Sequence, residues 1–218
     1  MGLALFDLDN TLLDGDSDYA WGQFLAEVGA VDREVYERTN QRFYDEYRAG
    51  TLDIQAFLAF ALEPLARHPH PQLLAWRASF IATCIEPMVK PAARAMLQAH
   101  ANAGDTPVII TATNSFVTRP IADLLGVPHL IATEPETEGG RFTGKVAGVP
   151  CFREGKLIRL NAWMQARGLD LRDSTFYSDS HNDIPLLEAV SRPIVVDADP
   201  ALAAHARVRR WPALHLKH

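Results

Sequence analysis

Apolar and polar positions divide this chain into two kinds of segment. Residues 3–6 form a short, uninterrupted apolar run, which is typical of a strand buried on both faces. After this run, up to about residue 87, apolar positions recur at helical spacing and are interrupted at Gly29, at Gly50 and in the HPHP run at 68–71. This pattern predicts four consecutive helices, at residues 17–28, 32–49, 53–67 and 72–85.

Beyond Pro91, short apolar runs alternate with helical segments. Strands that alternate with helices form right-handed βαβ units and a parallel sheet. The expected fold class is therefore α/β, with a doubly wound, Rossmann-like parallel sheet as the core and a four-helix cap inserted after the first strand. The later strands are expected at residues 108–110, 129–132, 176–177 and 194–196, and the later helices at 92–103, 116–125, 157–167 and 184–189.

This order of elements implies two domains. We expect an α/β core of residues 1–14 and 88–218 and a helical cap of residues 15–87. Between two of the core strands, the glycine pair at 139–140 predicts a β-hairpin or flap over residues 134–149.

One face of the third predicted helix is rich in aromatic residues. Phe57, Phe60, Ala61 and Leu65 recur near the 3.6-residue spacing of a helix. Such a face most simply packs inside a helical bundle, so we interpret it as cap core and not as an aromatic substrate site.

Composition and charge exclude several classes of protein. Hydrophobic residues make up 48% of the 218 positions and charged residues 22%, as in a fully folded globular chain. The net charge is −6 and basic residues are scattered outside 207–210, so no nucleic-acid partner is expected. Neither a cleavable leader nor an apolar run of about 18 residues is present, so no membrane association is expected. Treating Cys84 and Cys151 as reduced and buried, we expect a cytoplasmic protein.

Two aspartates, Asp7 and Asp9, directly follow the first strand. Carboxylates inside a strand buried on both faces carry a large desolvation cost, so both belong at its carboxyl end, where open parallel sheets bind ligands. Two crowded carboxylates imply either a shared proton or a hard cation such as Mg²⁺. The alternative is an aspartate-rich turn in which Asn10 and Thr11 serve as turn or cap residues.

Polar residues also follow two other predicted strands. Thr111 and Asn114 suit contacts to a substrate phosphate oxygen, although Thr113 or Asn114 can instead cap the next helix. Asp179 is placed to complete an oxygen-rich Mg²⁺ site with the first pair of aspartates. Asp183 is placed to orient a ligand or water behind it, or to stabilise the start of a helix.

A histidine and a lysine are interpreted by their place beside the predicted carboxylates. His181 is interpreted as a solvated loop histidine, because Mg²⁺ prefers oxygen ligands. Lys156 taken alone is an ordinary solvated lysine. Together with the carboxylates, however, it is the cation that balances them and holds a phosphate dianion.

Four of these features, in order along the chain, resemble the four motifs of the haloacid dehalogenase-like phosphohydrolases. They are DLDNT at 7–11, Thr111, Lys156 and SDSHND at 178–183. The helical insert, together with the sequence CFREGKLIRL around Lys156, resembles the phosphoserine-phosphatase-like subgroup, subfamily IB, which includes histidinol-phosphatases.

The resemblance implies a role for each residue that matches a motif. Asp7 attacks phosphorus and forms an aspartyl-phosphate, while Asp9 protonates the leaving alcohol and then deprotonates water. Thr111 and Lys156 hold the phosphoryl oxygens, and Mg²⁺ is bound by Asp7, Asp179 and the backbone carbonyl of Asp9. A haloacid dehalogenase is disfavoured, because that chemistry does not use a second acid at Asp9.

The resemblance also suggests a substrate class. In phosphoserine phosphatases, a glutamate shortly after the first motif meets the substrate amine, and an arginine on an insert helix meets its carboxylate. In this chain Asp16 stands where that glutamate is expected, and the position of that arginine falls near Ala61. This favours an amine-bearing phosphate ester such as histidinol phosphate, with phosphoserine as the alternative if Arg48 or Arg67 takes the place of the missing arginine.

Two other readings use the same residues. A phospho-receiver or binding module also groups an aspartate pair, a threonine and a lysine around Mg²⁺, but such modules are shorter and lack the helical insert. A Ca²⁺ loop starting at Asp14 is disfavoured, because Tyr19 stands where that loop needs glycine and Leu25 where it needs glutamate.

Overall fold

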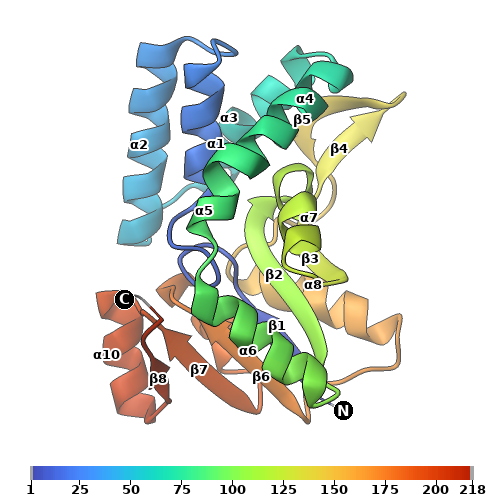
Figure 1. The fold of residues 1–218 in the computed structure, drawn as a ribbon. Coiled ribbons are helices and arrows are strands. Elements are labelled where there is room, and N and C mark those ends of the chain that lie inside the picture. Colours follow the sequence, from blue (N-terminus) through green and yellow to red (C-terminus); the bar gives the residue numbers. More distant parts are fainter. Residues whose placement is uncertain (1, 217–218) are drawn as a thin grey trace.

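Six parallel strands form the core of the protein (Figure 1). We describe residues 2–216 of the chain in a computed structural model. The strands lie in the order β3-β2-β1-β6-β7-β8, and every pair of neighbours is parallel. The predicted α/β fold with a parallel sheet is therefore confirmed. The strands are β1 (Leu3–Phe6), β2 (Thr106–Asn114), β3 (His129–Thr133), β6 (Ser174–Ser178), β7 (Arg192–Val196) and β8 (Ala213–Leu214).

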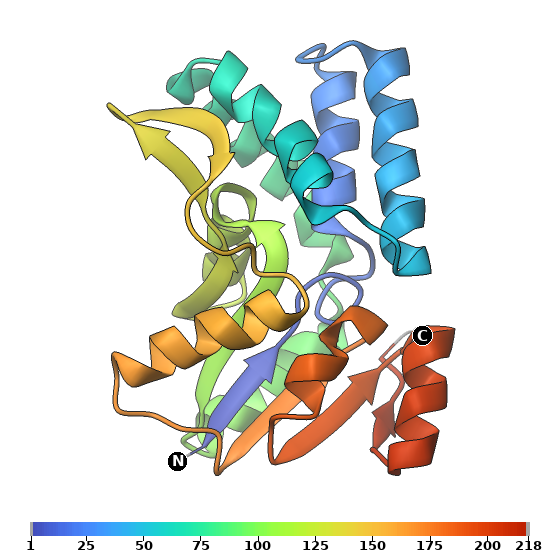
Figure 2. The ribbon, with the colours of Figure 1, turned by 180° about the vertical axis from the view of Figure 1, so that it is seen from behind.

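Helices cover both faces of this sheet. Leu3 and Leu5 of β1 belong to one apolar cluster with α8, α9 and α10, whereas Ala4 and Phe6 belong to another with α6 and α7. The two layers are visible in Figures 1 and 2, where α6 and α7 lie in front in one view and α8 in the other. Because alternate side chains of a strand point to opposite faces, a strand covered on both sides is apolar throughout. The helices are α6 (Pro91–Asn102), α7 (Ser115–Leu124), α8 (Glu154–Gln165), α9 (Ile184–Leu187) and α10 (Pro200–Arg209).

Two strands differ from the sequence-based expectation. β2 continues beyond the apolar run at 108–110 as far as Asn114, so Thr111 lies within the strand and not after it. β8 is not predicted by the sequence, because two exposed residues are too few to show a periodicity.

Four helices follow β1 and confirm the predicted insert. Aspartate side chains cap the first three: Asp16, Asp32 and Asp53 accept hydrogen bonds from backbone amides of the first helical turn. The fourth begins two residues earlier than predicted, because Pro71 is tolerated in the first turn of a helix. The helices are α1 (Ser17–Glu27), α2 (Arg33–Ala49), α3 (Ile54–Arg67) and α4 (His70–Phe80), followed by a π-helical segment (Ile81–Ile85) and α5 (Glu86–Met88).

The insert and one face of the sheet share a continuous apolar cluster. Trp21 of α1 and Leu62 of α3 belong to the same cluster as Phe6 of β1 and Ile109 of β2. Because apolar contacts run between the helices and the sheet, the division at residues 15–87 stays a prediction. We use the word cap below for the helices α1 to α4.

The predicted hairpin is confirmed. β4 (Pro135–Glu138) and β5 (Arg141–Val146) pair in antiparallel fashion. The two residues of the turn, Gly139 and Gly140, have φ angles of 56° and 78°, which two-residue hairpin turns require. β5 packs against α3, where a Cβ atom at Gly144 would lie 3.3 Å from Cβ of Ala66. The hairpin therefore rises from the core to lie beside the cap (Figure 1).

Two expectations drawn from composition can be compared with the structure. Both cysteines are free thiols; Cys151 is buried as predicted, whereas Cys84 is half-buried. Within residues 2–216, every helix is too short or too polar to cross a lipid bilayer.

A buried ion pair joins the start of α6 to the C-terminal part of the sheet. Lys90 Nζ lies 2.9 Å from the carboxylate of Asp197 and donates a 2.6 Å hydrogen bond to the carbonyl of Asn10. The charged side chains are only 4% and 6% exposed. Because removal of one charge leaves the other buried without this partner, we expect Lys90→Met to lower the free energy of unfolding in urea by about 3–5 kcal/mol. Lys90→Met/Asp197→Asn should recover part of this loss, and an unchanged free energy in the single variant contradicts the prediction.

Candidate active site

The polar residues predicted from the sequence meet at the carboxyl edge of the sheet. β1 lies between β2 and β6, so the segments that follow these three strands are neighbours. Phe6 pairs with Ile109 on one side and with Tyr177 on the other, which sets Asp7 beside both neighbouring strands. The strand order reverses at β1, which is where doubly wound sheets bind their ligands.

Lys156 forms a buried ion pair with two carboxylates. Its Nζ atom lies 2.7 Å from Asp7 Oδ1 and 2.7 Å from Asp183 Oδ2, and all three side chains are buried. Ser178 Oγ donates a further 2.7 Å hydrogen bond to Asp183 Oδ2. Burial acts to lower the pKa of Lys156, but the carboxylates of Asp183 and Asp7 hold this pKa above its usual value. Lys156 is therefore a buried cation and not a solvated surface lysine.

The negative charge of the carboxylates nevertheless exceeds the positive charge around them. Burial, opposed by Lys156 and reinforced by Asp183 and Asp9, raises the pKa of Asp7 to about 7. Burial and the neighbouring carboxylates of Asp7 and Asp183 also raise the pKa of Asp179 well above its usual value. A site with such an excess of negative charge favours the binding of a further cation or a proton.

The expected Mg²⁺ ligands fit this excess charge. Thr11 Oγ1 lies 3.4 Å from Asp7 Oδ2 and 3.3 Å from Asp179 Oδ1, so one hydroxyl group joins the two carboxylates. Oxygen donors of this kind suit a hard cation. Within residues 2–216, no three acidic, histidine or cysteine side chains form a metal site by themselves. A site here therefore needs a backbone ligand as well, for which the resemblance indicates the carbonyl of Asp9.

Asp9 has a separate set of hydrogen bonds. The backbone amide of Ser17 donates to Asp9 Oδ1 at 2.6 Å, and the hydroxyl of Thr113 donates to Asp9 Oδ2 at 2.9 Å. Thr111 Oγ1 lies 3.4 Å from the same Oδ2 atom. Thr111 and Thr113 are two residues apart in β2, so both side chains point to the same face of the strand. These contacts hold the Asp9 carboxylate in one orientation.

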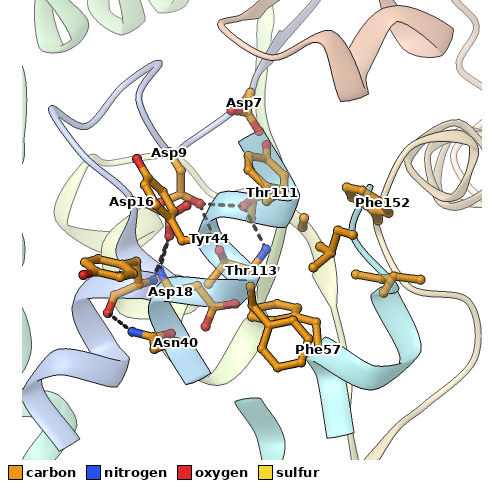
Figure 3. Close-up of a pocket in the computed structure, with 16 residues that line it drawn as sticks. Asp7, Asp9, Asp16, Asp18, Asn40, Tyr44, Phe57, Thr111, Thr113 and Phe152 are labelled. Atoms are coloured by element: carbon orange, nitrogen blue, oxygen red, sulfur yellow. Dashed lines mark hydrogen bonds between the residues drawn. The ribbon is translucent and has the colours of Figure 1, made fainter. Parts of the chain in front are cut away.

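A pocket of about 50 Å³ lies between these residues and the cap (Figure 3). This volume is smaller than that of a typical small-molecule site, so the cap lies close to Asp7 and Asp9 in this structure. Asp7 and Asp9 line one end of the pocket, whereas Asp18, Asn40 and Phe57 lie at the other end in this view. The pocket therefore extends from Asp7 and Asp9 to residues of the cap, and it must widen to hold a small molecule.

The aromatic face of α3 is only partly bundle core, which corrects the sequence-based interpretation. Ala61 and Leu65 are buried as predicted, but Phe57 lines the pocket, and Phe60 packs beside it in a cluster with Phe43. Helical spacing alone cannot distinguish an apolar face that meets another helix from one that meets a cavity. The aromatic residues that line the pocket are Tyr19, Phe43, Tyr44, Tyr47, Phe57 and Phe152.

Two further acids, Asp16 and Asp18, line the pocket. Asp16 Oδ1 accepts hydrogen bonds from the backbone amides of Asp18 at 2.9 Å and Tyr19 at 2.8 Å, so Asp16 both caps α1 and borders the pocket. Burial and the neighbouring Asp9 raise the pKa of Asp16 well above its usual value and that of Asp18 to about 7. Within the described part of the chain, the residues that line the pocket include no lysine or arginine.

The other residues considered for substrate contact lie elsewhere. Asn114 Oδ1 accepts a 3.2 Å hydrogen bond from the amide of Val117, so Asn114 caps α7 and does not line the pocket. Its geometry supports the alternative role as a helix cap. Arg48 borders a separate cleft beside Asp179, and Arg67 borders another groove on the cap. Neither arginine therefore lines the pocket that contains Asp7 and Asp9 in this structure.

Three residues of the site were given no ligand-related role from the sequence: Thr11, Thr113 and Asp18. For Thr113 the available signal was its two-residue spacing from Thr111, which places both hydroxyls on one face of a strand. For Asp18 it was the position in the first turn of a helix, two residues after Asp16. Thr11 meets Asp179 only through the fold, so no local signal identifies it.

Comparisons with known proteins identify the family of this chain. The family model of the haloacid dehalogenase-like hydrolases matches residues 4–188. A histidinol-phosphatase from Neisseria meningitidis serogroup C (strain 8013) is 44% identical over 219 residues, covering 99% of this chain and 99% of that protein.

Solved structures show the same fold. The crystal structure of a protein with unknown function from Bordetella pertussis Tohama I has a TM-score of 0.93 and 47% identity, covering 99% of this chain and 98% of that one. A phospho-aspartyl intermediate analogue of phosphoserine phosphatase has a TM-score of 0.72 and 19% identity, covering 100% and 94% respectively, and at this identity it shows the fold alone. The chain therefore belongs to the haloacid dehalogenase-like hydrolases, and it is a phosphatase of that family.

Proposed function

We propose that this phosphatase hydrolyses a small amine-bearing phosphate monoester such as histidinol phosphate, with Mg²⁺ and through an aspartyl-phosphate on Asp7. The observation that carries the substrate class is the charge of the pocket. Asp16 and Asp18 line it beyond the reacting aspartates, and its lining residues within 2–216 include no lysine or arginine. A cationic group is therefore favoured in this pocket, whereas a carboxylate has no partner there.

In the first half-reaction, a carboxylate oxygen of Asp7 attacks phosphorus while the bond from phosphorus to the ester oxygen breaks. Asp9 gives its proton to the departing oxygen, which leaves as the alcohol. Lys156, already 2.7 Å from Asp7, and Thr111 hold the phosphoryl oxygens during this transfer. A bound Mg²⁺ neutralises negative charge on the transferring group.

In the second half-reaction, a water molecule attacks phosphorus and the bond from phosphorus to Asp7 breaks, which releases inorganic phosphate. Asp9, now ionised, takes the proton of this water. The hydrogen bonds from Ser17 and Thr113 keep the Asp9 carboxylate in place through both steps. One carboxylate thus serves first as acid and then as base.

The leaving group lies under the cap in this proposal. A substrate amine pairs with Asp16 or Asp18, and the aromatic wall contacts an apolar or flat group through packing and cation–π interactions. Histidinol phosphate carries both an amine and a flat imidazole ring. The 44% identical relative named histidinol-phosphatase supports the same substrate class.

Two alternatives make different demands on this pocket. Phosphoserine would bring its carboxylate among Asp16 and Asp18 without a basic partner. A phospho-receiver without turnover would need no pocket for a leaving group, and a stable phosphorylated Asp7 in the purified protein would favour it. A turnover screen of phosphomonoesters with Mg²⁺ separates these possibilities.

Substrate preference gives the sharpest test of the proposal. A charge-assisted hydrogen bond to an amine is worth about 1–3 kcal/mol, so an amine-bearing phosphate ester should exceed a neutral one in kcat/KM by roughly 5-fold to 150-fold. Phosphoserine should gain less, because its carboxylate has no basic partner in the pocket, so histidinol phosphate should be the better substrate in competition experiments. Asp16→Asn and Asp18→Asn should each lower the ratio of kcat/KM for an amine-bearing substrate to kcat/KM for a neutral one. Asparagine also caps helices well, so Asp16→Asn removes the charge while keeping α1 capped.

Asp32→Asn is the matched control for this measurement. Asp32 caps α2 through the amide of Val35 and does not line the pocket, so its variant should leave the substrate ratio unchanged. Phosphoserine as the better substrate, or an unchanged ratio in both pocket variants, contradicts the proposed substrate class. The assignment as a phosphatase does not depend on either result.

We also propose a cytoplasmic location. The motivation is that both cysteines are free thiols, as expected in a reducing compartment. Cell fractionation beside a cytoplasmic marker tests this, and recovery of the protein with membranes or outside the cell contradicts it.

A further inference from the structure

The C-terminal end of α2 contacts the loop that follows β6. Tyr47 donates a 3.2 Å hydrogen bond from its hydroxyl to Ser180 Oγ, and its backbone carbonyl lies 3.4 Å from Asn182 Nδ2. Figure 2 shows this end of α2, in light blue, above the orange loops of the core. The same loop carries Asp179 and Asp183, so the cap touches a segment that supplies two of the active-site carboxylates.

Arg153 links this contact to the segment that carries Lys156. Its Nη2 atom donates a 2.6 Å hydrogen bond to the carbonyl of Gly50, the residue that ends α2, and its Nε atom donates a 3.0 Å bond to Asn182 Oδ1. One guanidinium group therefore joins the cap to the loop after β6. Arg153 lies three residues before Lys156, and Asn182 directly precedes Asp183.

The backbone of Arg153 is strained. Its φ and ψ angles are 50° and −123°, a region that side chains other than glycine rarely adopt. Such strain persists only where surrounding contacts hold it, and it is common at functional sites. Here a 2.8 Å hydrogen bond from the Gly155 amide to the Phe152 carbonyl closes the turn, and the side chain adds its contacts with Gly50 and Asn182.

His181 lies on the other side of Gly50, which corrects its interpretation as a solvated histidine. Its Nδ1 atom is 2.8 Å from the carboxylate of Asp199, and this acid also accepts a 2.7 Å hydrogen bond from the His181 amide. The opposite ring atom, Nε2, is 2.6 Å from the position that a Cβ atom would take at Gly50. An alanine at position 50 would therefore displace the His181 ring, which Asp199 holds in this arrangement.

The pocket must open for substrate to enter. Asp7 and Lys156 are 5% and 3% exposed, and the pocket that Asp7 lines has a volume of only about 50 Å³, so a phosphate ester fits there only when the cap moves away from the core. Tyr44 and Tyr47 of α2 line the pocket from the cap, and Phe152, next to Arg153, lines it from the core. Movement at Gly50 would therefore break the Arg153 contacts and open the pocket together.

We propose that Arg153 is a positioning residue that couples closure of the cap to assembly of the active site. When Gly50 seats between Arg153 and His181, the guanidinium group holds Asn182 and thereby the neighbouring Asp183. The strained turn at Arg153 at the same time places Lys156 between Asp183 and Asp7. The inference needs the protein to be a phosphatase but not any particular substrate, so p-nitrophenyl phosphate with Mg²⁺ serves as the probe.

Gly50→Ala tests the fit of the cap. Gly29 and Gly50 both follow a helix with a φ angle of 71°, so alanine strains the backbone equally at the two positions. A Cβ atom at Gly29 meets nothing within 4 Å, whereas one at Gly50 meets His181. We expect Gly50→Ala to lower kcat/KM at least about tenfold, and Gly29→Ala to leave it unchanged.

A double variant tests whether contact with the His181 ring causes the loss of activity in Gly50→Ala. His181→Ala removes the ring that the new Cβ atom meets, so His181→Ala/Gly50→Ala should have a kcat/KM close to that of His181→Ala alone. Two results would overturn the proposal. One is an equal loss of kcat/KM in Gly50→Ala and Gly29→Ala. The other is a loss of kcat/KM in the double variant equal to the product of the losses in His181→Ala and Gly50→Ala.

Arg153→Gly separates positioning from stability. Glycine adopts the observed backbone angles without strain, and this relief offsets the loss of the two hydrogen bonds of the side chain, so the free energy of unfolding in urea should stay close to that of the parent protein. We nevertheless expect its kcat to fall at least about tenfold, with a smaller change in KM, because Lys156 and Asp183 lose their alignment. Arg153→Lys, which keeps the charge but not both hydrogen bonds, should recover only part of this loss.

The outcomes are distinguishable from failure of the proposed function. A parent protein that fails to hydrolyse the probe and every other phosphomonoester contradicts the proposed function. An active parent protein with an Arg153→Gly variant of equal kcat, or a variant whose loss of activity follows only its loss of stability, contradicts the role of Arg153.

Discussion

Asp7→Asn should lose essentially all turnover, on the order of 10⁵-fold or more, because the amide cannot replace the carboxylate as a nucleophile. The substitution is nearly isosteric, so Lys156 and Asp183 can keep their contacts with each other at 2.7 Å. Steady-state hydrolysis of p-nitrophenyl phosphate with Mg²⁺ measures the loss. Wild-type kcat in this variant shows that Asp7 is not the nucleophile.

A control and a direct signature accompany this measurement. Asp123→Asn removes an exposed carboxylate on α7 that pairs only with Arg119 among the contacts observed, and it should leave kcat unchanged. Acyl phosphates react with hydroxylamine, so peptide mapping after this treatment should find the hydroxamate at Asp7 in the parent protein. The same mapping of Asp7→Asn should find none.

Asp9→Asn should lower steady-state turnover on the order of 10²-fold to 10⁴-fold, because a neutral amide neither protonates the leaving oxygen nor accepts a proton from water. Its effect should differ between the two half-reactions. An aryl phosphate has a leaving group that needs no proton, so the first release of p-nitrophenol should be much less affected than the first release of an alkyl alcohol. Rapid-mixing experiments on both substrate types measure this difference.

The contacts of Asp9 make the variant informative. Asparagine retains an oxygen that can accept the hydrogen bonds from Ser17 or Thr113, so the local structure is conserved while the proton transfer is removed. Thr113→Val is a useful companion, because it loosens Asp9 without removing its acid group and should cost less than Asp9→Asn. Equal first-step losses on aryl and alkyl phosphates would contradict a role for Asp9 as general acid.

The aspartates of the site could be predicted because short sequence patterns place them at the ends of strands. A run of four apolar residues identifies a buried strand, and polar residues that follow such a strand must lie at its end. Asp7, Asp9 and Asp179 were placed at one edge of a parallel sheet by this argument, and the structure brings them together there. The four-helix insert is predictable for a similar reason, since helix-breaking residues and helical periodicity act over only a few positions.

The sequence does not decide the role of a polar residue where its side chain suits two partners. Asn114 follows a strand and also precedes a helix, and the amide of Val117 takes its oxygen as a cap. Asp16 caps α1 and borders the pocket at the same time. The sequence names the candidates in such cases, but the choice depends on which atoms the fold brings within hydrogen-bond distance.

The chain by itself determined the α/β class, the place of the helical insert and the chemical character of the aspartates at the strand ends, because these follow from patterns within a few residues. Only the tertiary structure decided that Lys156 lies between Asp7 and Asp183, that Phe57 faces a pocket, and that Gly50 seats against His181. Each of these contacts joins positions far apart in the sequence. Their partners are set by the packing of the cap on the sheet, which no local pattern contains.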